Sequence, residues 1–384
     1  MELKISYQYT YFIHPFIIKE EEFENYIKKM SNDKNFKLKI FEKKKDINIY
    51  NYFLPKTREF LFSSFSSIFE YIPKEDIQGK IDDKTGIFFT IPKISVICFK
   101  TGICFLIIKT NVTDYEHFRN ILNFNYKFKN IIKENEKLNS YDSIRIQSTN
   151  FADVETLKQY IKQITGSNLE TKKLNIDTEG FLIYSYIFID QQAWGPENDF
   201  EKIKHEFIKY TNLLNADNSR QLKLEEKSVF TRWKYAKMAI NSLGISLFSS
   251  TADVNNYTIL PDEYEKQYLY TYLINLYKKI YLKKIEYEFK KSKKLKNTRN
   301  KFIKFTKEIW AQEITRDETG VVLNKKIFET LKIKEIYEQV NNKYDILYKN
   351  LNIEKNKKTT IIISIMLVIS IIFNIINFIA LLKK

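Results

Sequence analysis

The stretch Thr359–Leu382, TTIIISIMLVISIIFNIINFIALL, contains no charged residue and no proline. A helix of this length covers about 36 Å, which is enough to cross a hydrocarbon core of roughly 30 Å with some tilt. Core helices of soluble proteins rarely run so far without a charge. Residues 359–382 are therefore predicted to form a single transmembrane helix that holds the rest of the chain at a membrane.

Basic residues flank this stretch on both sides. Lys355, Lys357 and Lys358 precede it, and Lys383 and Lys384 follow it. The opening residues, MELKISYQYTYFIHPF, have neither the long apolar core nor the cleavage site of a secretory signal. We therefore expect a single-pass protein of the cell membrane with its soluble region in the cytoplasm, and the preceding lysines agree with that orientation. The two lysines that follow argue weakly against a C-terminus on the far side.

The composition is that of a folded protein with about two domains in 384 residues, since 44% of the residues are hydrophobic and 29% are charged. The net charge of +16 favours anionic lipid surfaces or phosphate-bearing ligands. The net charge is partly a codon effect, because the heavy use of Lys, Asn, Ile, Tyr and Phe looks like that of an AT-rich coding sequence. Without a recognisable motif, we expect no direct nucleic-acid binding.

Cysteine and histidine give no metal-binding signal. Cys98 and Cys104 lie nearly opposite each other in a predicted hairpin, where a reducing cytosol favours free apolar thiols over a disulfide. His14, His117 and His205 are far apart, so no ligand spacing is present. No metal site is predicted, and the cofactor, if one exists, is unknown from the sequence.

Residues 1–215 are predicted to form an α/β cytosolic domain. The clearest signal is the hairpin 93–110, whose two β-branched runs flank Lys100-Thr101-Gly102. Residues 5–13 and 181–190 are predicted as strands, 37–43 and 48–55 as short extended pieces, and 19–30, 155–165 and a segment starting at Pro55 as helices. Thr113 and Glu116 have the spacing of a capping box that opens another helix.

Residues 216–305 are predicted to be helical. The apolar segment 234–248 is too short for a membrane span, and a long helix covers 262–294 with a tyrosine-rich stripe. A basic tract follows it. Such a tract is usually a solvated surface, and the functional alternative is contact with anionic lipid or a bound nucleotide.

Residues 306–358 are predicted to form a stalk. Thr315 and Glu318 have the spacing of a second capping box. Beyond them, apolar residues recur at alternating steps of four and three over about three heptads, a coiled-coil pattern. The members of this seam are Ile333, Tyr337, Val340, Tyr344, Leu347 and Leu351. The seam could pack against helix 262–294 or against copies of itself, and no proline separates it from the membrane span.

Three polar residues inside the span share one face of the helix. Ser370, Asn374 and Asn377 are four and three residues apart. Carboxamides in hydrocarbon need partners, and a ring of identical helices supplies them. The stripe is either a helix-packing contact or the lining of a pore, and both interpretations imply an oligomer.

No catalytic motif occurs in the chain. GxGxxG, GxxxxGK[ST], HExxH and GxSxG are all absent. The carboxylates lie in helical charge patterns with lysines or in loops without a nucleophile. We therefore expect no enzyme and assign no catalytic residue.

Several phrases of the sequence resemble divergent CorA-like membrane proteins, relatives of the CorA magnesium transporters. They are His14-Pro15-Phe16, Tyr52-Phe53-Leu54-Pro55, Arg58-Glu59-Phe60-Leu61-Phe62, Thr101-Gly102-Ile103-Cys104-Phe105-Leu106, Ile121-Leu122-Asn123-Phe124-Asn125, and Phe305 to Gly320 with Trp310, Glu313-Ile314-Thr315 and Glu318-Thr319-Gly320. The resemblance implies an N-terminal α/β domain, a stalk helix that continues into the membrane, and a ring of about five subunits around a pore.

The chain also departs from that family. CorA transporters have two spans and a Gly-Met-Asn motif after the first, whereas this chain has one predicted span and no Gly-Met-Asn. No selectivity residues carry over, and magnesium transport is not implied. Some CorA-like relatives are membrane effectors linked to antiviral defence, so the resemblance implies a nucleotide ligand for the cytosolic domain.

The sequence thus predicts an α+β, homo-oligomeric membrane protein whose cytosolic domain senses a ligand and whose single span forms or perturbs a pore. Trp310, residues 315–320 and the heptad seam are the predicted coupling region. The first alternative is a tail-anchored scaffold or tether without ion conduction. The second is a membrane-attached enzyme with an unrecognised site.

Overall fold

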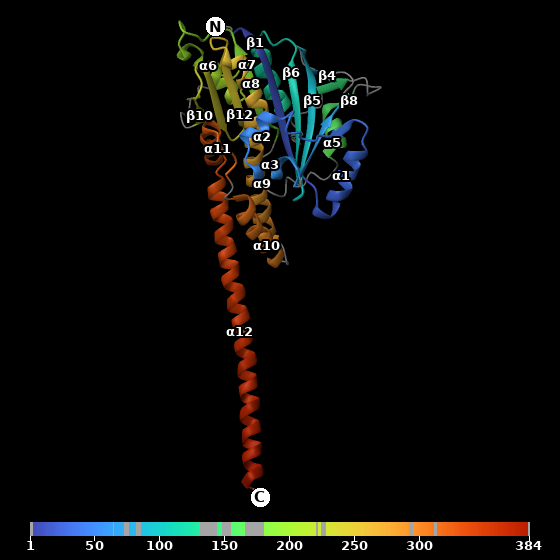
Figure 1. Cartoon of the computed structure of the whole chain (residues 1–384), viewed down its shortest axis with the longest axis vertical. Helices are drawn as coiled ribbons and strands as arrows, with labels where there is room; N and C mark the ends of the chain where they lie inside the picture. Colours follow the sequence, from blue (N-terminus) through green and yellow to red (C-terminus); the bar gives the residue numbers. More distant parts are fainter. Residues whose placement is uncertain are drawn as a thin grey trace.

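A computed structural model describes residues 3–63, 65–72, 77–81, 86–130, 144–147, 155–165, 180–219, 222–223, 228–291, 295–310 and 313–382. These residues form a head of mixed helices and strands, from which one long helix projects (Figure 1). The predicted α+β class is confirmed.

The strands of the head form one sheet. Its path is β10-β11-β12-β9-β1-β6-β5-β4-β7-β8, and β3 joins β2 to β5 beside this path. Only β12 and β9 pair in parallel among the described strands. The strands are β1 (Ile5–Ile17), β2 (Phe36–Leu38), β3 (Ser66–Tyr71), β4 (Ile77–Ile81), β5 (Ile87–Phe99), β6 (Ile103–Val112), β7 (Ile144–Gln147), β8 (Glu155–Thr156), β9 (Leu182–Ile189), β10 (Val229–Phe230), β11 (Ala236–Asn241) and β12 (Gly244–Ser250).

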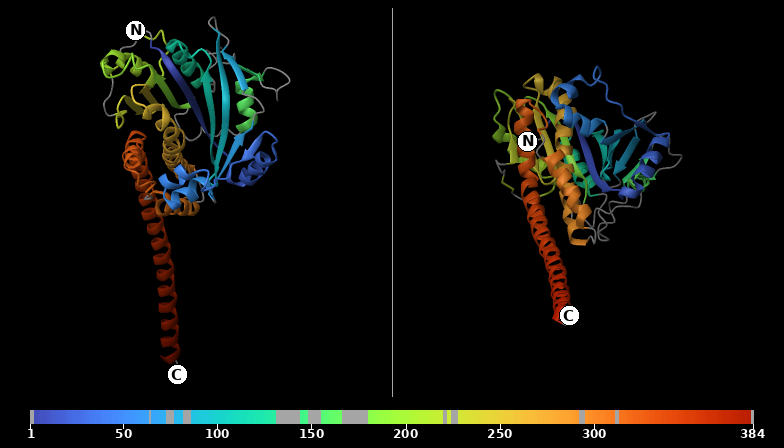
Figure 2. Two further views of the ribbon diagram at one scale, coloured as in Figure 1. Left: turned by 45° about the horizontal axis from the view of Figure 1, so that its top comes forward. Right: turned by 60° about the horizontal axis from the view of Figure 1, so that its bottom comes forward.

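Helices cover both faces of the sheet, as the two views of Figure 2 show. Because side chains alternate along a strand, Tyr9 and Tyr11 face α2, α3, α9, α11 and the start of α12, whereas Phe12 faces α1, α4 and α5. The helices are α1 (Phe23–Asn32), α2 (Ile47–Tyr52), α3 (Pro55–Phe62), α4 (Phe118–Lys129), α5 (Leu157–Thr165), α6 (Lys204–Thr211), α7 (Asn255–Thr258), α8 (Leu260–Glu263), α9 (Leu269–Lys291), α10 (Leu295–Phe305), α11 (Glu318–Thr330) and α12 (Ile333–Leu382), with π-helices η6 (Tyr264–Tyr268) and η7 (Thr306–Trp310) and short 3-10 helices η1 (Glu20–Glu22) and η4 (Phe200–Ile203).

The strongest local predictions are confirmed. The hairpin of β5 and β6 turns at Gly102, whose φ is 80°. Glycine adopts this conformation without steric cost because it has no Cβ atom. Cys98 and Cys104 lie opposite each other across this hairpin. Both are buried, and both are free thiols. The predicted strands at 5–13 and 181–190 correspond to β1 and β9.

The helical prediction for residues 234–248 is wrong. These residues form β11 and β12, so the sheet extends well past residue 215. The run is apolar because both of its faces are buried, and a continuous apolar run cannot distinguish such a strand from a buried helix. Gly244 fixes the close approach of β12 to β9, since a Cβ there would lie 1.8 Å from the carbonyl oxygen of Ile183.

Three smaller predictions are also corrected. The helix α2 (Ile47–Tyr52) takes up the first residues of the predicted extended piece 48–55. The helix predicted to open at Thr113 begins only at Phe118, where His117 is the N-cap and makes no side-chain cap. At the second predicted capping box, Asp317 caps α11 by accepting a hydrogen bond from the Gly320 amide, while Thr315 Oγ1 accepts from the Asp317 amide.

Candidate functional site

The C-terminal helix α12 is continuous over 50 residues, from Ile333 to Leu382. The prediction that stalk and apolar stretch form one helix is confirmed. Within the predicted stalk region, η7 (Thr306–Trp310) and α11 (Glu318–Thr330) precede α12. Lys332, with a φ of 53°, makes the sharp turn between α11 and α12.

The first half of the heptad seam packs against the chain's own head. Ile333 and Val340 are fully buried, and the Tyr337 ring stacks on Trp310 with a centroid distance of 3.9 Å. Tyr344 packs against Phe302 of α10 at 5.5 Å. Of the two arrangements that the sequence left open, this part of the seam adopts the intramolecular one. The side chains of Leu347 and Leu351, further along α12, lie outside the described residues.

A cluster of charges also fixes the stalk to the head. Lys343 of α12 donates a hydrogen bond to Glu286 of α9, and Lys283 and Lys290 lie within 3.5 Å of the same carboxylate. Partial burial opposes ionisation of Glu286, but the hydrogen bond from Lys343 and the three ammonium charges outweigh it and lower the pKa of Glu286. The carboxylate thus remains ionised and holds α9 and α12 together.

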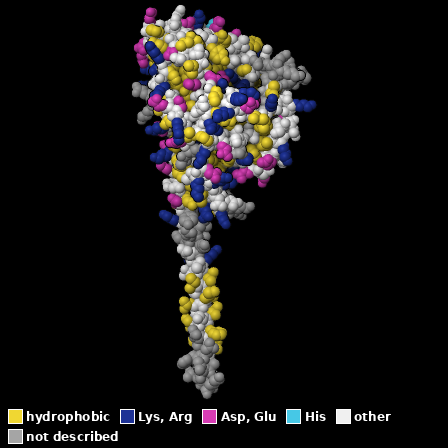
Figure 3. Space-filling view, in the orientation of Figure 1, with side chains coloured by type: hydrophobic (Ala, Val, Ile, Leu, Met, Phe, Trp, Pro, Cys, Tyr) yellow, Lys and Arg dark blue, Asp and Glu magenta, His cyan; other side chains and the backbone are white. Residues whose placement is uncertain are grey.

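Beyond this contact, α12 projects from the head, and hydrophobic side chains cover the middle of the projecting part on the face that Figure 3 shows. Residues Asn356–Phe373 form the one helical window, among the described residues, that is long and apolar enough to cross a membrane. None of its side chains is buried, and Met366 is 67% exposed. An apolar surface of this extent is unlike the small patches of soluble monomers.

The predicted polar and basic residues of α12 are only partly described. Ser370, Lys357 and Lys358 are exposed on the helix. Asn374 and Asn377 lie in the helix at the predicted spacing, but their side chains, like that of Lys355, lie outside the described residues. Their role in pore lining or helix packing stays a prediction.

The turn before α11 is held against the segment between α2 and α3. Thr315 pairs with Phe53 in an isolated β-bridge, and the Leu54 amide donates to the Ile314 carbonyl. At the start of α11, a Cβ on Gly320 would lie 2.4 Å from the Tyr52 hydroxyl oxygen. The predicted coupling region is therefore tightly packed between α2 and α12.

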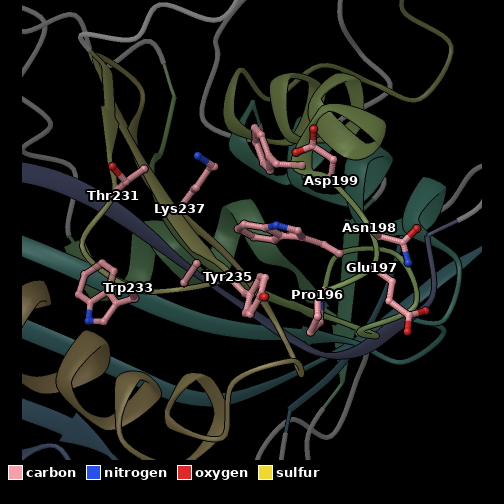
Figure 4. Close-up of a pocket in the computed structure, with 12 residues that line it drawn as sticks. Pro196, Glu197, Asn198, Asp199, Thr231, Trp233, Tyr235 and Lys237 are labelled. Carbon is pink, nitrogen blue, oxygen red and sulfur yellow. The ribbon is translucent and has the colours of Figure 1, made fainter.

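Sequence reasoning missed a pocket of about 520 Å³ on the other side of α11. Trp233 and Tyr235 come from the segment that leads into β11, and Lys237 lies in β11 itself. Pro196, Glu197, Asn198 and Asp199 come from the facing loop after β9 (Figure 4). The remaining lining residues are Trp194, Gly195, Phe200, Thr231 and Ala236. The available signal was that two of the chain's three tryptophans lie in loop sequence.

The pocket wall is connected directly to α11. Arg232 Nη2 lies 2.7 Å from the Glu318 carboxylate in the first turn of α11, and Lys326 Nζ donates to the Val229 carbonyl at 2.6 Å. The segment 229–233 therefore contacts both ends of the helix that precedes the stalk.

The same wall touches the π-helix η6. The Trp233 ring lies 5.9 Å from Tyr268, whose hydroxyl donates to Glu263. Burial, together with this hydrogen bond to a carboxylate, raises the pKa of Tyr268, so it stays a neutral donor. Glu265 of η6 is itself tied to β6 by the Lys109 ammonium at 2.5 Å. The π-helix is thus held in place where it packs against Trp233.

The described residues contain no group of three or more His, Cys, Asp or Glu side chains that could hold a metal ion. Comparisons with protein-family models and with curated proteins gave no match. The functional interpretation therefore depends on the geometry of α12, the coupling region and the pocket.

Proposed function

We propose that this protein is a membrane protein of the cell membrane, anchored by α12 with the head in the cytoplasm. Its copies assemble through their membrane helices, and the assembly forms or perturbs a pore when the head binds a ligand. The lipid bilayer and other copies of the chain are its partners in this proposal.

The observation that carries the proposal is the exposed apolar surface of α12 between Ile361 and Ile376. Burying one large aliphatic side chain contributes about 1.5–3 kcal/mol, so leaving more than ten of them in water is very unfavourable. A helix also satisfies its own backbone hydrogen bonds, as a bilayer requires. Lipid is the environment that covers all sides of a single projecting helix.

The polar residues of α12 support assembly, because lipid chains offer them no hydrogen-bond partner. Asn374 and Asn377 lie at positions that a helix places on one face, together with Ser370. Amide groups in hydrocarbon gain hydrogen bonds from neighbouring helices. If the chain is built like the CorA-like proteins that it resembles, about five copies surround a central pore. Antiviral defence and a nucleotide ligand are parts of that same resemblance.

One observation favours a second function, a tail-anchored scaffold or tether without conduction. The seam side chains of the upper stalk pack against the head of the same chain, so the head and upper stalk do not require a second copy. These residues are Ile333, Tyr337, Val340 and Tyr344. A tether needs only the anchor and a binding surface on the head.

Flux through reconstituted liposomes separates the two functions. We expect the full chain to release an entrapped ion or dye from the liposomes. The double substitution Asn374→Leu and Asn377→Leu should reduce release by about tenfold, because it replaces two polar side chains of the predicted pore face with apolar ones. Release is compared at equal protein incorporation, and in the presence of cell extract as a source of ligand.

The matched control replaces Ile372 and Ile376 by Leu, which leaves the polar face intact. Equal release from the Asn double variant and the wild type contradicts the pore lining. No release above empty liposomes under any condition, with the protein inserted, supports the tether instead.

A further inference from the structure

The pocket between residues 194–200 and 231–237 combines aromatic walls with a single inward cation. Trp194 is 5% exposed and packs against Phe200 at 5.1 Å and Tyr235 at 6.2 Å. Lys237 Nζ lies 4.4 Å from the centre of the Phe200 ring. Among the described residues, Lys237 takes part in no ion pair, and its ammonium lies over the Phe200 ring.

These groups define a kind of ligand by their chemistry. Aromatic side chains bind flat rings by stacking and edge contacts, each worth about 0.5–1.5 kcal/mol beyond the area that is buried. A half-buried ammonium without a carboxylate partner gains a charge-assisted hydrogen bond from an anion. The volume of about 520 Å³ lies within the range of small-molecule sites.

We propose that this pocket binds a small molecule that has a flat aromatic ring and one carboxylate or phosphate group. The ring lies among Trp194, Trp233 and Tyr235, and the anionic group lies at the Lys237 ammonium. The hydroxyl of Thr231, which also lines the pocket, is a further hydrogen-bond donor for that group.

The rim of the pocket limits the charge of the ligand. Glu197 and Asp199 are exposed members of the facing loop and carry negative charge. They repel a molecule with several anionic groups, whereas a single anion at Lys237 is separated from them by the ring that it carries. The pocket therefore selects aromatic molecules with one anionic group over molecules with several.

Occupancy of the pocket also acts on the stalk, and this part of the inference rests on the proposed function. A ring against Trp233 presses on the segment 229–233, which holds α11 through Arg232–Glu318 and Lys326. Because α11 leads into α12 through the turn at Lys332, a shift of that segment reaches the membrane helix. The Arg232–Glu318 pair is exposed, so removing it changes the coupling with little effect on stability.

The binding step is tested on the full chain in lipid nanodiscs by saturation-transfer NMR and titration. The probes are indole-3-acetate for the carboxylate source and adenosine 5′-monophosphate for the phosphate source, each with its neutral partner, indole-3-acetamide or adenosine. We expect one of the acids to bind the wild type, and Lys237→Gln to weaken it by about tenfold because one charge-assisted hydrogen bond is lost. The neutral partners bind both proteins equally.

Lys234→Gln is the matched control, since Lys234 is an exposed lysine of the same segment that does not line the pocket. Binding that is equal in the wild type, Lys237→Gln and Lys234→Gln overturns the site, as does binding of neither acid. Saturable binding of an aromatic peptide, but of neither acid, overturns it in favour of a protein partner.

The coupling step is tested with Arg232→Gln. We expect this variant to bind the active probe with wild-type affinity but to lose the probe-dependent change in liposome release. Unaltered probe-dependent release in Arg232→Gln contradicts the route through α11. Probe binding without any release from the wild type leaves the site intact and counts against the proposed pore, so the two failures are distinguishable.

Discussion

His14 illustrates how a residue that invites a functional interpretation can belong to the core. It lies in the middle of β1, is 2% exposed, and packs near Phe16 and Phe181. Neither ring nitrogen has a hydrogen-bond partner within the described part of the chain. Burial lowers the pKa of His14 to about 4, so the imidazole is neutral at physiological pH. The phrase His14-Pro15-Phe16 thus marks the sheet rather than a site.

The His14 pKa predicts a pH dependence of stability. The unfolded chain takes up a proton at His14 below pH 6.5, whereas the folded chain does so only near pH 4. The free energy of unfolding should therefore fall as the pH drops from 6.5 to 4, by about 3 kcal/mol from this residue. The substitution His14→Leu should remove that part of the slope and stabilise the protein by about 1–3 kcal/mol at pH 7, because two unpartnered nitrogens are lost.

Denaturant unfolding at pH 7 and pH 5 measures both effects. Replacing His205, an exposed histidine of α6, by Leu serves as the control and should leave the slope unchanged. Parallel pH profiles for the wild type and His14→Leu would mean that folding does not shift the pKa of His14, and they would contradict this prediction.

At the scale of elements, local signals predicted the hairpin of β5 and β6 and the continuous helix α12. Both depend on short-range chemistry, a glycine turn in one case and an unbroken helical pattern in the other. The strands β11 and β12 could not be predicted, because β12 pairs with β9, which is distant in the sequence, and β11 joins the sheet through β12. Only this tertiary pairing decides their conformation. The cap at Asp317 was misplaced by two residues because Thr315 is used by the β-bridge to Phe53.

Neither the pocket nor the docking of the stalk could be predicted from the sequence, for the same reason. Trp194 and Trp233 line the same pocket only because β9 and β12 are neighbours in the sheet. Trp310 meets Tyr337 only because α11 reverses the chain. The heptad spacing identified the packed face of the stalk but not its partner. The partner is the chain's own η7, α9 and α10.

The stacking of Trp310 on Tyr337 predicts how firmly the stalk is held. Trp310→Ala should weaken the docking of the first turns of α12 by about 1–3 kcal/mol, because it removes an aromatic stack and contacts to Phe305 and Phe328. Hydrogen exchange of the amides between Lys334 and Val340 should accelerate accordingly. Ile346→Ala is the control on the same helix, since Ile346 is 59% exposed. Equal exchange in both variants contradicts a docking role for Trp310.

At the scale of the whole molecule, a folded head and an apolar helix are joined without a flexible linker. The contacts that hold α12 to the head include Lys343 and Tyr344, and the candidate span begins near Asn356. About 18 Å of helix separates these two points at 1.5 Å per residue. A displacement of the head is therefore transmitted to the span through a continuous helix, with no loop in between to absorb it. Ligand-controlled gating requires such a rigid connection.

The oligomeric mass of the full chain in detergent, measured beside a chain that ends at Asn356, tests the central claim most directly. The shorter chain keeps every described contact between α12 and the head, so its head should fold normally. The account predicts a closed ring of several copies for the full chain and a monomer for the shorter one, because the membrane helices supply the assembly contacts. A monomer or a simple dimer for both chains leaves no room for a central pore and would contradict the account.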